Sequence, residues 1–123
     1  NCLLFDRRFE AGDEPVKVRM REGRIVEFRK RPDPSIRFDT EGESVGFFKL
    51  RGDALLALKE ITGRYIARGE SHLPHEDALR ELFIAADFPI GAEDITGLPW
   101  MEIDFPDDLL RARREVQAEV DRE

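Results

Sequence analysis

Three side chains that could bind a ligand stand at every second position within residues 98–108: Trp100, Glu102 and Asp104. Read as a β-strand, this stretch places them on one face, about 7 Å apart along the strand. Carboxylate oxygens are the ligands that Mg²⁺ prefers, and an indole face attracts ammonium groups. The spacing therefore predicts a strand with an indole and two carboxylates on one face, side-chain types that could take part in such binding. The alternatives are an edge strand with one solvated face and an indole that only walls the core.

The residues between and after these three side chains indicate how the fold would position them. Met101, Ile103 and Phe105 alternate with the polar side chains and would enter a hydrophobic core. Pro106 then stands where a helix takes its first residue, and the two aspartates that follow suit the positive end of a helix dipole. The carboxylate row is thus expected to end at a strand-to-helix junction, a common place for chemistry in α/β proteins.

Upstream residues predict the strands of the sheet. An apolar strand is expected at 2–5, and alternation at 16–21 and 24–30 around Glu22-Gly23 predicts a β-hairpin with a solvated basic face. A further strand at 44–50 contains Gly46, which marks either a bulge or a close approach to the backbone.

Three helices are expected from apolar periodicity and end signals. The first runs from 54 to 68, capped by Asp53 and ended by Gly69, with a buried stripe of Leu55, Leu58, Ile61, Thr62 and Tyr65. The second begins at Pro74, with an apolar face of Leu79, Leu82, Phe83 and Ala86. The third is an amphipathic helix over 106–121.

Composition narrows the class of protein. The chain has 123 residues, 41% hydrophobic and 38% charged, which is typical of one globular domain rather than a disordered segment. Its net charge of −7 argues against nucleic acid or an anionic membrane as a partner. Cys2 is the single cysteine, so no internal disulfide can form, and no apolar run is long enough for a membrane helix. We expect a cytoplasmic protein.

Three separated motifs resemble a known family. They are Gly42-Glu-Ser-Val-Gly-Phe-Phe-Lys49, Pro74-His-Glu-Asp-Ala-Leu-Arg80, and Glu93-Asp-Ile-Thr-Gly-Leu-Pro-Trp-Met-Glu-Ile-Asp-Phe-Pro-Asp-Asp-Leu109. In this order they resemble the C-terminal signatures of sugar-phosphate-type nucleotidyltransferases. The nearest branch is the phosphocholine and 2-aminoethylphosphonate cytidylyltransferases. The resemblance covers most of the chain, from about residue 25 to residue 112.

The resemblance implies a fold and a reaction. The fold would be α/β, the C-terminal half of a Rossmann-like nucleotidyltransferase with a mixed β-sheet. Residues 1–123 would be the acceptor-binding part of a single domain. The family's Gly-rich nucleotide loop, G-x-G-x-R, has no counterpart in this sequence, so we expect a fragment without activity of its own. The alternative is a non-catalytic binding or interaction module. The missing N-terminal half, or a second copy of the chain, is the expected protein partner.

The same resemblance implies roles for individual residues. Asp104 would hold Mg²⁺, and Glu102 would either join it through water or face the cationic end of the acceptor. Lys30 would neutralise the acceptor's phosphate, a role for which Arg31 competes. Glu43, Glu76 and Trp100 would bind the acceptor, although Glu43 also suits an exposed turn. The substrates would be a nucleoside triphosphate, CTP by resemblance, and a small phosphorylated alcohol or phosphonate.

Overall fold

The computed structural model describes residues 1–85, 87 and 89–122, which form an α/β fold around a mixed five-stranded sheet. The strands are β1 (Cys2–Asp6), β2 (Lys17–Arg21), β3 (Arg24–Arg29), β4 (Thr40–Lys49) and β5 (Gly91–Asp94). Their order across the sheet is β3-β2-β4-β1-β5. Only the β1–β5 pair is parallel, and the other neighbours are antiparallel. The predicted α/β class with a mixed sheet is therefore confirmed.

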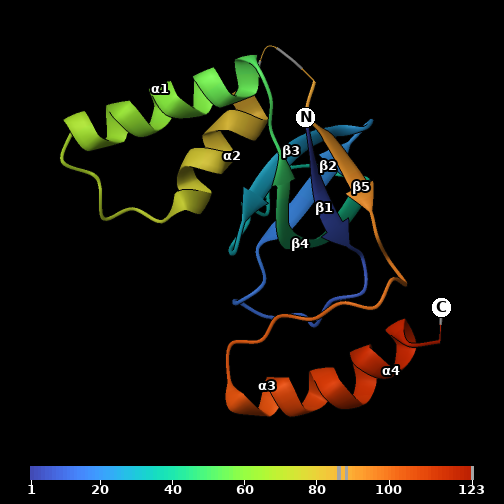
Figure 1. The fold of residues 1–123 in the computed structure, drawn as a ribbon. Helices are drawn as coiled ribbons and strands as arrows, with labels where there is room; N and C mark the ends of the chain where they lie inside the picture. Colours follow the sequence, from blue (N-terminus) through green and yellow to red (C-terminus); the bar gives the residue numbers. More distant parts are fainter. Residues whose placement is uncertain (86, 88, 123) are drawn as a thin grey trace.

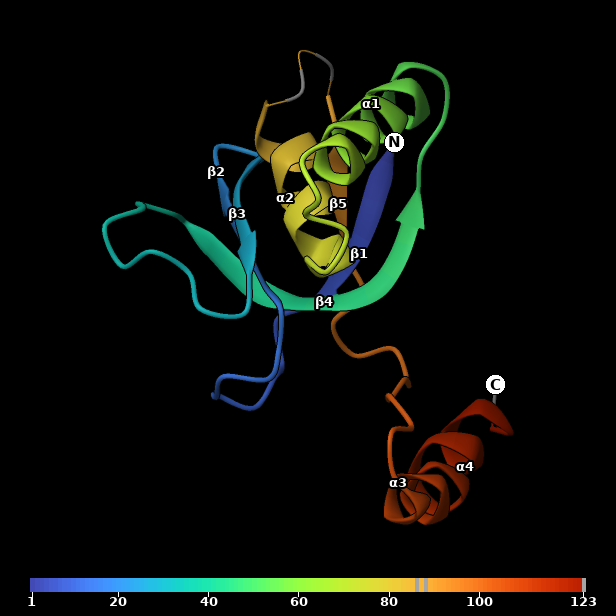
Figure 2. The same ribbon diagram turned by 90° about the vertical axis from the view of Figure 1, so that its left-hand side faces the viewer.

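Helices α1 (Asp53–Ala67) and α2 (His75–Ala85) cover one side of the sheet. Helix α2 packs against β3, and α1 packs on α2 (Figure 1). Figure 2 shows β4 curving around α2, so the sheet partly wraps the helix. Helix α1 begins and ends within one residue of the predicted positions, and α2 begins one residue after the predicted start at Pro74. Ala86, predicted on the apolar face of the second helix, lies outside the described residues.

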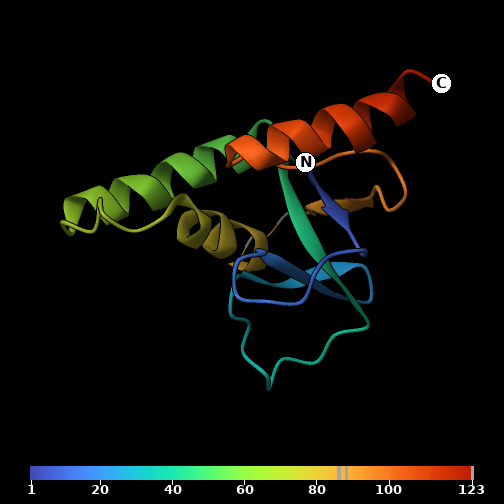
Figure 3. The same ribbon diagram turned by 90° about the horizontal axis from the view of Figure 1, so that it is seen from below.

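The C-terminal helical rod follows an extended segment and lies apart from α1 and α2 (Figures 1 and 2). It consists of α3 (Pro106–Arg111), the π-helical segment η1 (Ala112–Val116) and α4 (Gln117–Val120), which form one straight rod in Figure 3. Pro106 occupies its first turn, as predicted. None of the residues from 106 to 120 is buried. The helix exists as expected, but its apolar stripe is not part of the core.

Aromatic rings from the sheet and from α2 form the centre of the core. The Phe28 ring lies 5.0 Å from that of Phe83, and the Phe48 ring lies 5.8 Å from Phe83. Leu3, Val18 and Leu82 are fully or almost fully buried around them. Because side chains of β1, β2, β3 and α2 meet here, burial of this cluster is what holds the sheet to the helix.

Two glycines let β4 follow β1 through a change of register. A Cβ on Gly42 would stand 2.5 Å from the Phe5 ring and 2.7 Å from the Asp6 carbonyl oxygen, so the two strands approach closely only because residue 42 has no side chain. Gly46 has φ of 79° and lies in the bulge where the β1–β4 register shifts. Of the two roles predicted for a glycine in this strand, Gly46 therefore marks the bulge.

The predicted strand between residues 98 and 105 is wrong. All of these residues are described and none is in a strand, and the last strand, β5, ends at Asp94. The backbone N–H groups of Asp104 and Phe105 donate to the Asp108 carboxylate at 3.2 and 2.9 Å, rather than to a neighbouring strand. Ile103 and Phe105 are exposed. Alternation alone did not form a strand, because a strand needs a neighbour for its backbone groups.

Three smaller predictions are also corrected. Leu55 is 52% exposed rather than buried, because α1 turns only part of its predicted stripe toward α2. Gly52, not Asp53, is the N-cap of α1, and it provides no side-chain cap. The hairpin's basic face is not simply solvated: Lys17 is buried, and Arg19 pairs with Glu41 at 2.5 Å.

Candidate functional site

The end of β1 brings a buried carboxylate, Asp6, beside three of the predicted site residues. The β1–β4 register pairs Asp6 with Glu43, so their side chains leave the same face of the sheet. Trp100 Nε1 donates to Asp6 Oδ2 at 2.7 Å, and the backbone N–H of Arg8 donates to Asp6 Oδ1, also at 2.7 Å. Asp6 is 6% exposed, and these two donors compensate for its burial.

Glu43 lies in a field of negative charge. Burial is the largest cause that raises the pKa of its carboxyl, and the neighbouring charges of Glu102 and Asp6 raise it further. Lys17, its cross-strand neighbour on β2, acts in the opposite direction but does not outweigh them. The pKa of Glu43 is therefore above its ordinary value of 4.5. An ammonium ligand here would favour the ionised carboxylate, and a proton is the alternative way to lower the repulsion.

We call this group the Asp6 cluster: Asp6, Glu43, Trp100 and Glu102. The structure thus brings together Glu43, Trp100 and Glu102, which were predicted from two separate motifs. Sequence analysis missed Asp6, around which they gather. Its signal was available, because Asp6 directly follows the apolar residues of β1, and polar groups at the carboxyl ends of strands often form sites in α/β proteins.

Lys30 and Glu76 line a second site, a hollow of about 620 Å³ that we call the Lys30 hollow. It lies between the end of β3 and the start of α2. Its lining residues are Asp13, Glu14, Phe28, Arg29, Lys30, Arg31, Pro74, Glu76 and Asp77. Cations therefore come from the end of β3 and the residues after it, whereas Glu76 and Asp77 belong to the first turn of α2. Lys30 and Arg31 both line the hollow, so the choice between them stays open.

Exposed ion pairs occupy two of the three cations of the Lys30 hollow, Lys30 and Arg31. Lys30 Nζ lies 3.2 Å from Glu14 Oε2, and Arg31 lies 2.9 Å from the Asp13 carboxylate. Glu76 contacts the imidazole of His75 at 3.3 Å. Such exposed pairs contribute little to stability, about 0–1 kcal/mol each, so an anionic ligand could replace them.

Asp104 belongs to neither group. It is exposed, and among the described residues its carboxylate makes no hydrogen bond or ion pair. Within the same described part of the chain, no three His, Cys, Asp or Glu side chains are arranged to hold a metal ion. Mg²⁺ is commonly bound through one or two carboxylates together with phosphate oxygens, so Asp104 and Glu102 fit it as donors only with ligand oxygens completing the shell.

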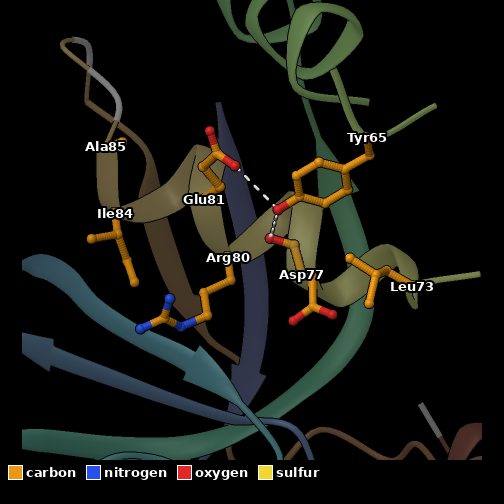
Figure 4. Close-up of a pocket in the computed structure, with 7 residues that line it drawn as sticks. All are labelled: Tyr65, Leu73, Asp77, Arg80, Glu81, Ile84 and Ala85. Atoms are coloured by element: carbon orange, nitrogen blue, oxygen red, sulfur yellow. Dashed lines mark hydrogen bonds between the residues drawn. The ribbon is translucent and has the colours of Figure 1, made fainter. Parts of the chain in front are cut away.

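A third hollow, of about 440 Å³, lies along α2 beside Tyr65 of α1 (Figure 4). Tyr65, predicted as a core residue, is half-buried there, and its hydroxyl donates to Glu81 Oε2 at 3.1 Å. Burial and the Glu81 carboxylate raise the pKa of Tyr65. Figure 4 shows Arg80 pointing from α2 toward the sheet, where its guanidinium pairs with Glu27 at 2.6 Å. The polar groups here join helix to helix and helix to sheet, which indicates a structural role.

The sequence is similar to part of a much longer protein. The sequence is 35% identical over 96 residues to a protein of Rubrobacter xylanophilus named bifunctional IPC transferase and DIPP synthase. The alignment covers 78% of this chain and 19% of that protein, so this chain spans about a fifth of the length of the curated relative that it matches. No family model matches the chain, and no solved structure matches it significantly. Within the described residues, none of the helices has the length and apolar character needed to cross a membrane.

Proposed function

We propose that this chain is the acceptor-binding part of a magnesium-dependent nucleotidyltransferase, with residues 1–123 forming the C-terminal half of a Rossmann-like domain. The reaction would transfer CMP from CTP to a small phosphorylated alcohol or phosphonate. Support comes first from the order of the three motifs. A relative whose name assigns it a transferase activity agrees with this at a coarse level. Its name specifies neither CTP nor a phosphonate, and both remain part of the proposal.

The observation that supports the proposal most is the gathering of Glu43, Trp100 and Glu102 around Asp6. These residues come from two motifs about 60 positions apart in the sequence, and they meet at the carboxyl end of β1. A negatively charged group beside an indole suits the ammonium end of an acceptor such as phosphocholine or 2-aminoethylphosphonate. The Lys30 hollow contains three cations that could face an acceptor phosphate, Arg29, Lys30 and Arg31, alongside four carboxylates.

The chemistry would be a direct displacement. An oxygen of the acceptor's phosphate or phosphonate forms a bond to the α-phosphorus of CTP, and the bond to the β-phosphate oxygen breaks to release pyrophosphate. Lys30 would lower the repulsion between the two polyanions, Glu43 would face the cationic end of the acceptor, and Glu76 would bind the acceptor from the side of the Lys30 hollow. Mg²⁺, when held by Asp104 and Glu102 together with phosphate oxygens, would supply charge stabilisation on the phosphoryl group.

Acceptor binding can be tested on the chain itself. We expect phosphocholine and 2-aminoethylphosphonate to shift the amide NMR signals of residues 28–31 and 75–77 in a saturable titration. Lys30→Gln should weaken this binding about tenfold, since a charge-assisted contact to the phosphate is lost. Arg24→Gln is the matched control, because Arg24 is an exposed cation at the other end of β3. Equal weakening by both variants, or no saturable shift, would contradict the proposal.

The metal role of Asp104 has its own test. In a protein that carries this chain together with the nucleotide-binding half, Mn²⁺, a paramagnetic substitute for Mg²⁺, should broaden the NMR signals near residue 104 when CTP is present. Asp104→Asn should reduce this broadening at equal Mn²⁺. Asp107→Asn is the control, since Asp107 is an exposed carboxylate in the first turn of α3. Identical broadening in the two variants would remove Asp104 from the metal site. Pyrophosphate release from CTP should be measured in a protein that carries both this chain and the nucleotide-binding half. Release indicates an enzyme, and its absence indicates a binding module without turnover.

A further inference from the structure

The segment before β2 places two carboxylates against the cations of the Lys30 hollow. Asp13 pairs with Arg31 at 2.9 Å, and Glu14 pairs with Lys30 at 3.2 Å. All four residues line the 620 Å³ hollow. Two of the three cations that would attract an anionic ligand are therefore already paired with carboxylates of the same chain.

A buried lysine holds the base of this segment in place. Lys17 Nζ donates to the carbonyl oxygen of Gly12 and, at 2.7 Å, to the carbonyl oxygen of Lys30. Lys17 is 9% exposed, so loss of these acceptors would leave a buried ammonium group without partners. The two hydrogen bonds of Lys17 thus keep residues 11–15 beside residues 30 and 31, whichever way the Asp13 and Glu14 carboxylates point.

Asp13 and Glu14, the two acidic residues of this segment, are held only weakly. The Glu14 side chain is 93% exposed and that of Asp13 is 69% exposed, while their partners Lys30 and Arg31 are 50% and 79% exposed. Solvent screening leaves such pairs with little free energy. A ligand could therefore displace the Asp13 and Glu14 side chains, while the hydrogen bonds of Lys17 keep the segment itself in place.

We propose that residues 11–15 are an anionic lid, in which Asp13 and Glu14 occupy Arg31 and Lys30 until a phosphate or phosphonate group displaces them. This rests on the proposed function, which brings such a group to the hollow, and adds that the chain competes with its own ligand. A phosphate dianion carries the charge to replace both carboxylates, whereas a neutral ligand gains nothing by opening the lid. The lid therefore selects for doubly charged acceptors.

The test is a titration with inorganic phosphate, followed by the amide NMR signals of residues 12–15 and 30–31. Asp13→Asn/Glu14→Gln removes both internal competitors and should lower the apparent Kd for phosphate about 2- to 30-fold, as expected for two exposed ion pairs. The control, Glu60→Gln/Glu119→Gln, changes the net charge equally at exposed positions outside the hollow. It should lower the Kd by less than about 1.5-fold at 0.15 M salt, where distant charges are screened.

A third variant separates failure of the lid from failure of the site. Lys30→Gln/Arg31→Gln should abolish the response to phosphate. If it does, but Asp13→Asn/Glu14→Gln binds phosphate no more tightly than its control, the lid is wrong and the cation site survives. If Lys30→Gln/Arg31→Gln binds phosphate like the unchanged chain, or if neither the unchanged chain nor Asp13→Asn/Glu14→Gln binds it, both the lid and the phosphate role of Lys30 are overturned.

Discussion

Helix α2 and the C-terminal helical rod have similar sequence patterns but opposite environments. Each begins with acidic residues in its first turn and carries apolar residues at helical spacing. Helix α2 buries four of them, Ala78, Leu79, Leu82 and Phe83, against the sheet and α1, whereas no residue from 106 to 120 is buried. The difference is that α2 has the sheet and α1 to pack against, and most of a helix's stability in a protein comes from packing its apolar face. An amphipathic pattern therefore predicts a helix but not a place in the core.

The two regions also differ in how their charges are used. In the packed region Glu27 is 0% exposed, yet it accepts hydrogen bonds from Arg80 at 2.6 Å and from the Phe28 backbone N–H at 2.9 Å. Burial raises the pKa of Glu27, but these donors outweigh burial and leave the pKa below its ordinary value. In the C-terminal region the ion pairs are exposed and long, as for Arg111 and Glu115 at 3.9 Å. The Glu27–Arg80 pair therefore holds α2 to the sheet, whereas the ion pairs of the C-terminal rod are solvated.

The largest expected effect comes from breaking the buried pair. Arg80→Met leaves the Glu27 carboxylate buried without its partner and should lower the free energy of unfolding by about 3 kcal/mol, measured by urea denaturation at pH 7. Arg64→Met is the control, because the Arg64–Glu81 pair is more exposed; its loss should cost less than about 1 kcal/mol. Equal costs for the two variants would mean that burial of Glu27 has no energetic consequence.

The pH dependence of the Arg80 variant sharpens this test. In the unchanged chain the pKa of Glu27 is lowered on folding, so its contribution to stability is present above about pH 4.5 and is lost as the pH falls through the folded pKa. Without Arg80 the remaining burial raises this pKa, and protonation then stabilises the folded state. The difference between the two proteins should therefore shrink at pH 4, as measured by the midpoint of urea unfolding.

A middle-sized effect is expected where the C-terminal region touches the sheet. Trp100→Phe keeps an aromatic ring but removes the 2.7 Å hydrogen bond to buried Asp6, which should lower the free energy of unfolding by about 1–3 kcal/mol. Far-UV circular dichroism in urea measures this. Phe9→Leu, a comparably conservative change at a half-buried aromatic with no polar atom, is the control and should cost less. A smaller loss for Trp100→Phe than for Phe9→Leu would show that the hydrogen bond is not what anchors this region.

A smaller effect, of opposite sign, is expected at Glu43. Its pKa is raised on folding, first by burial and then by Glu102 and Asp6, so stability falls as the pH rises from 4.5 through the folded pKa. Glu43→Gln removes this cost and should raise the melting temperature at pH 7, with the gain disappearing at about pH 4. Glu93→Gln, at an exposed position on β5, should leave the melting temperature unchanged at both pH values. A gain that persists at pH 4 would show that the effect is not electrostatic.

The smallest effect is expected on the rod. Leu110→Ala should change the free energy of unfolding by no more than about 0.5 kcal/mol, because Leu110 is 60% exposed, whereas Leu82→Ala in α2 should cost about 2–5 kcal/mol. Both values come from the same urea titration. A large cost at Leu110 would mean that the rod packs on something in solution, and the contrast between the two helices would fail.

Features governed by nearby residues could be predicted from the sequence. The β2–β3 hairpin follows from alternation on both sides of Glu22-Gly23, and these two residues have positive φ, as a tight turn requires. The starts of α2 and α3 follow from a proline near the first turn and acidic residues after it. Of the candidate site residues, Lys30 was taken from the end of the predicted hairpin and Glu76 from the motif at 74–80, and the structure places both on one hollow.

Features that depend on a distant partner were decided only by the tertiary structure. Alternation from residue 98 to 105 predicted a strand, but no neighbouring strand pairs with it, so its backbone hydrogen bonds go to Asp108. The burial of Glu27 depends on Arg80, 53 positions later, and the role of Asp6 depends on Trp100, 94 positions later. Local patterns express backbone and side-chain preferences within a few residues. A buried charge or an unpaired strand is stable or unstable according to what the folded chain places next to it.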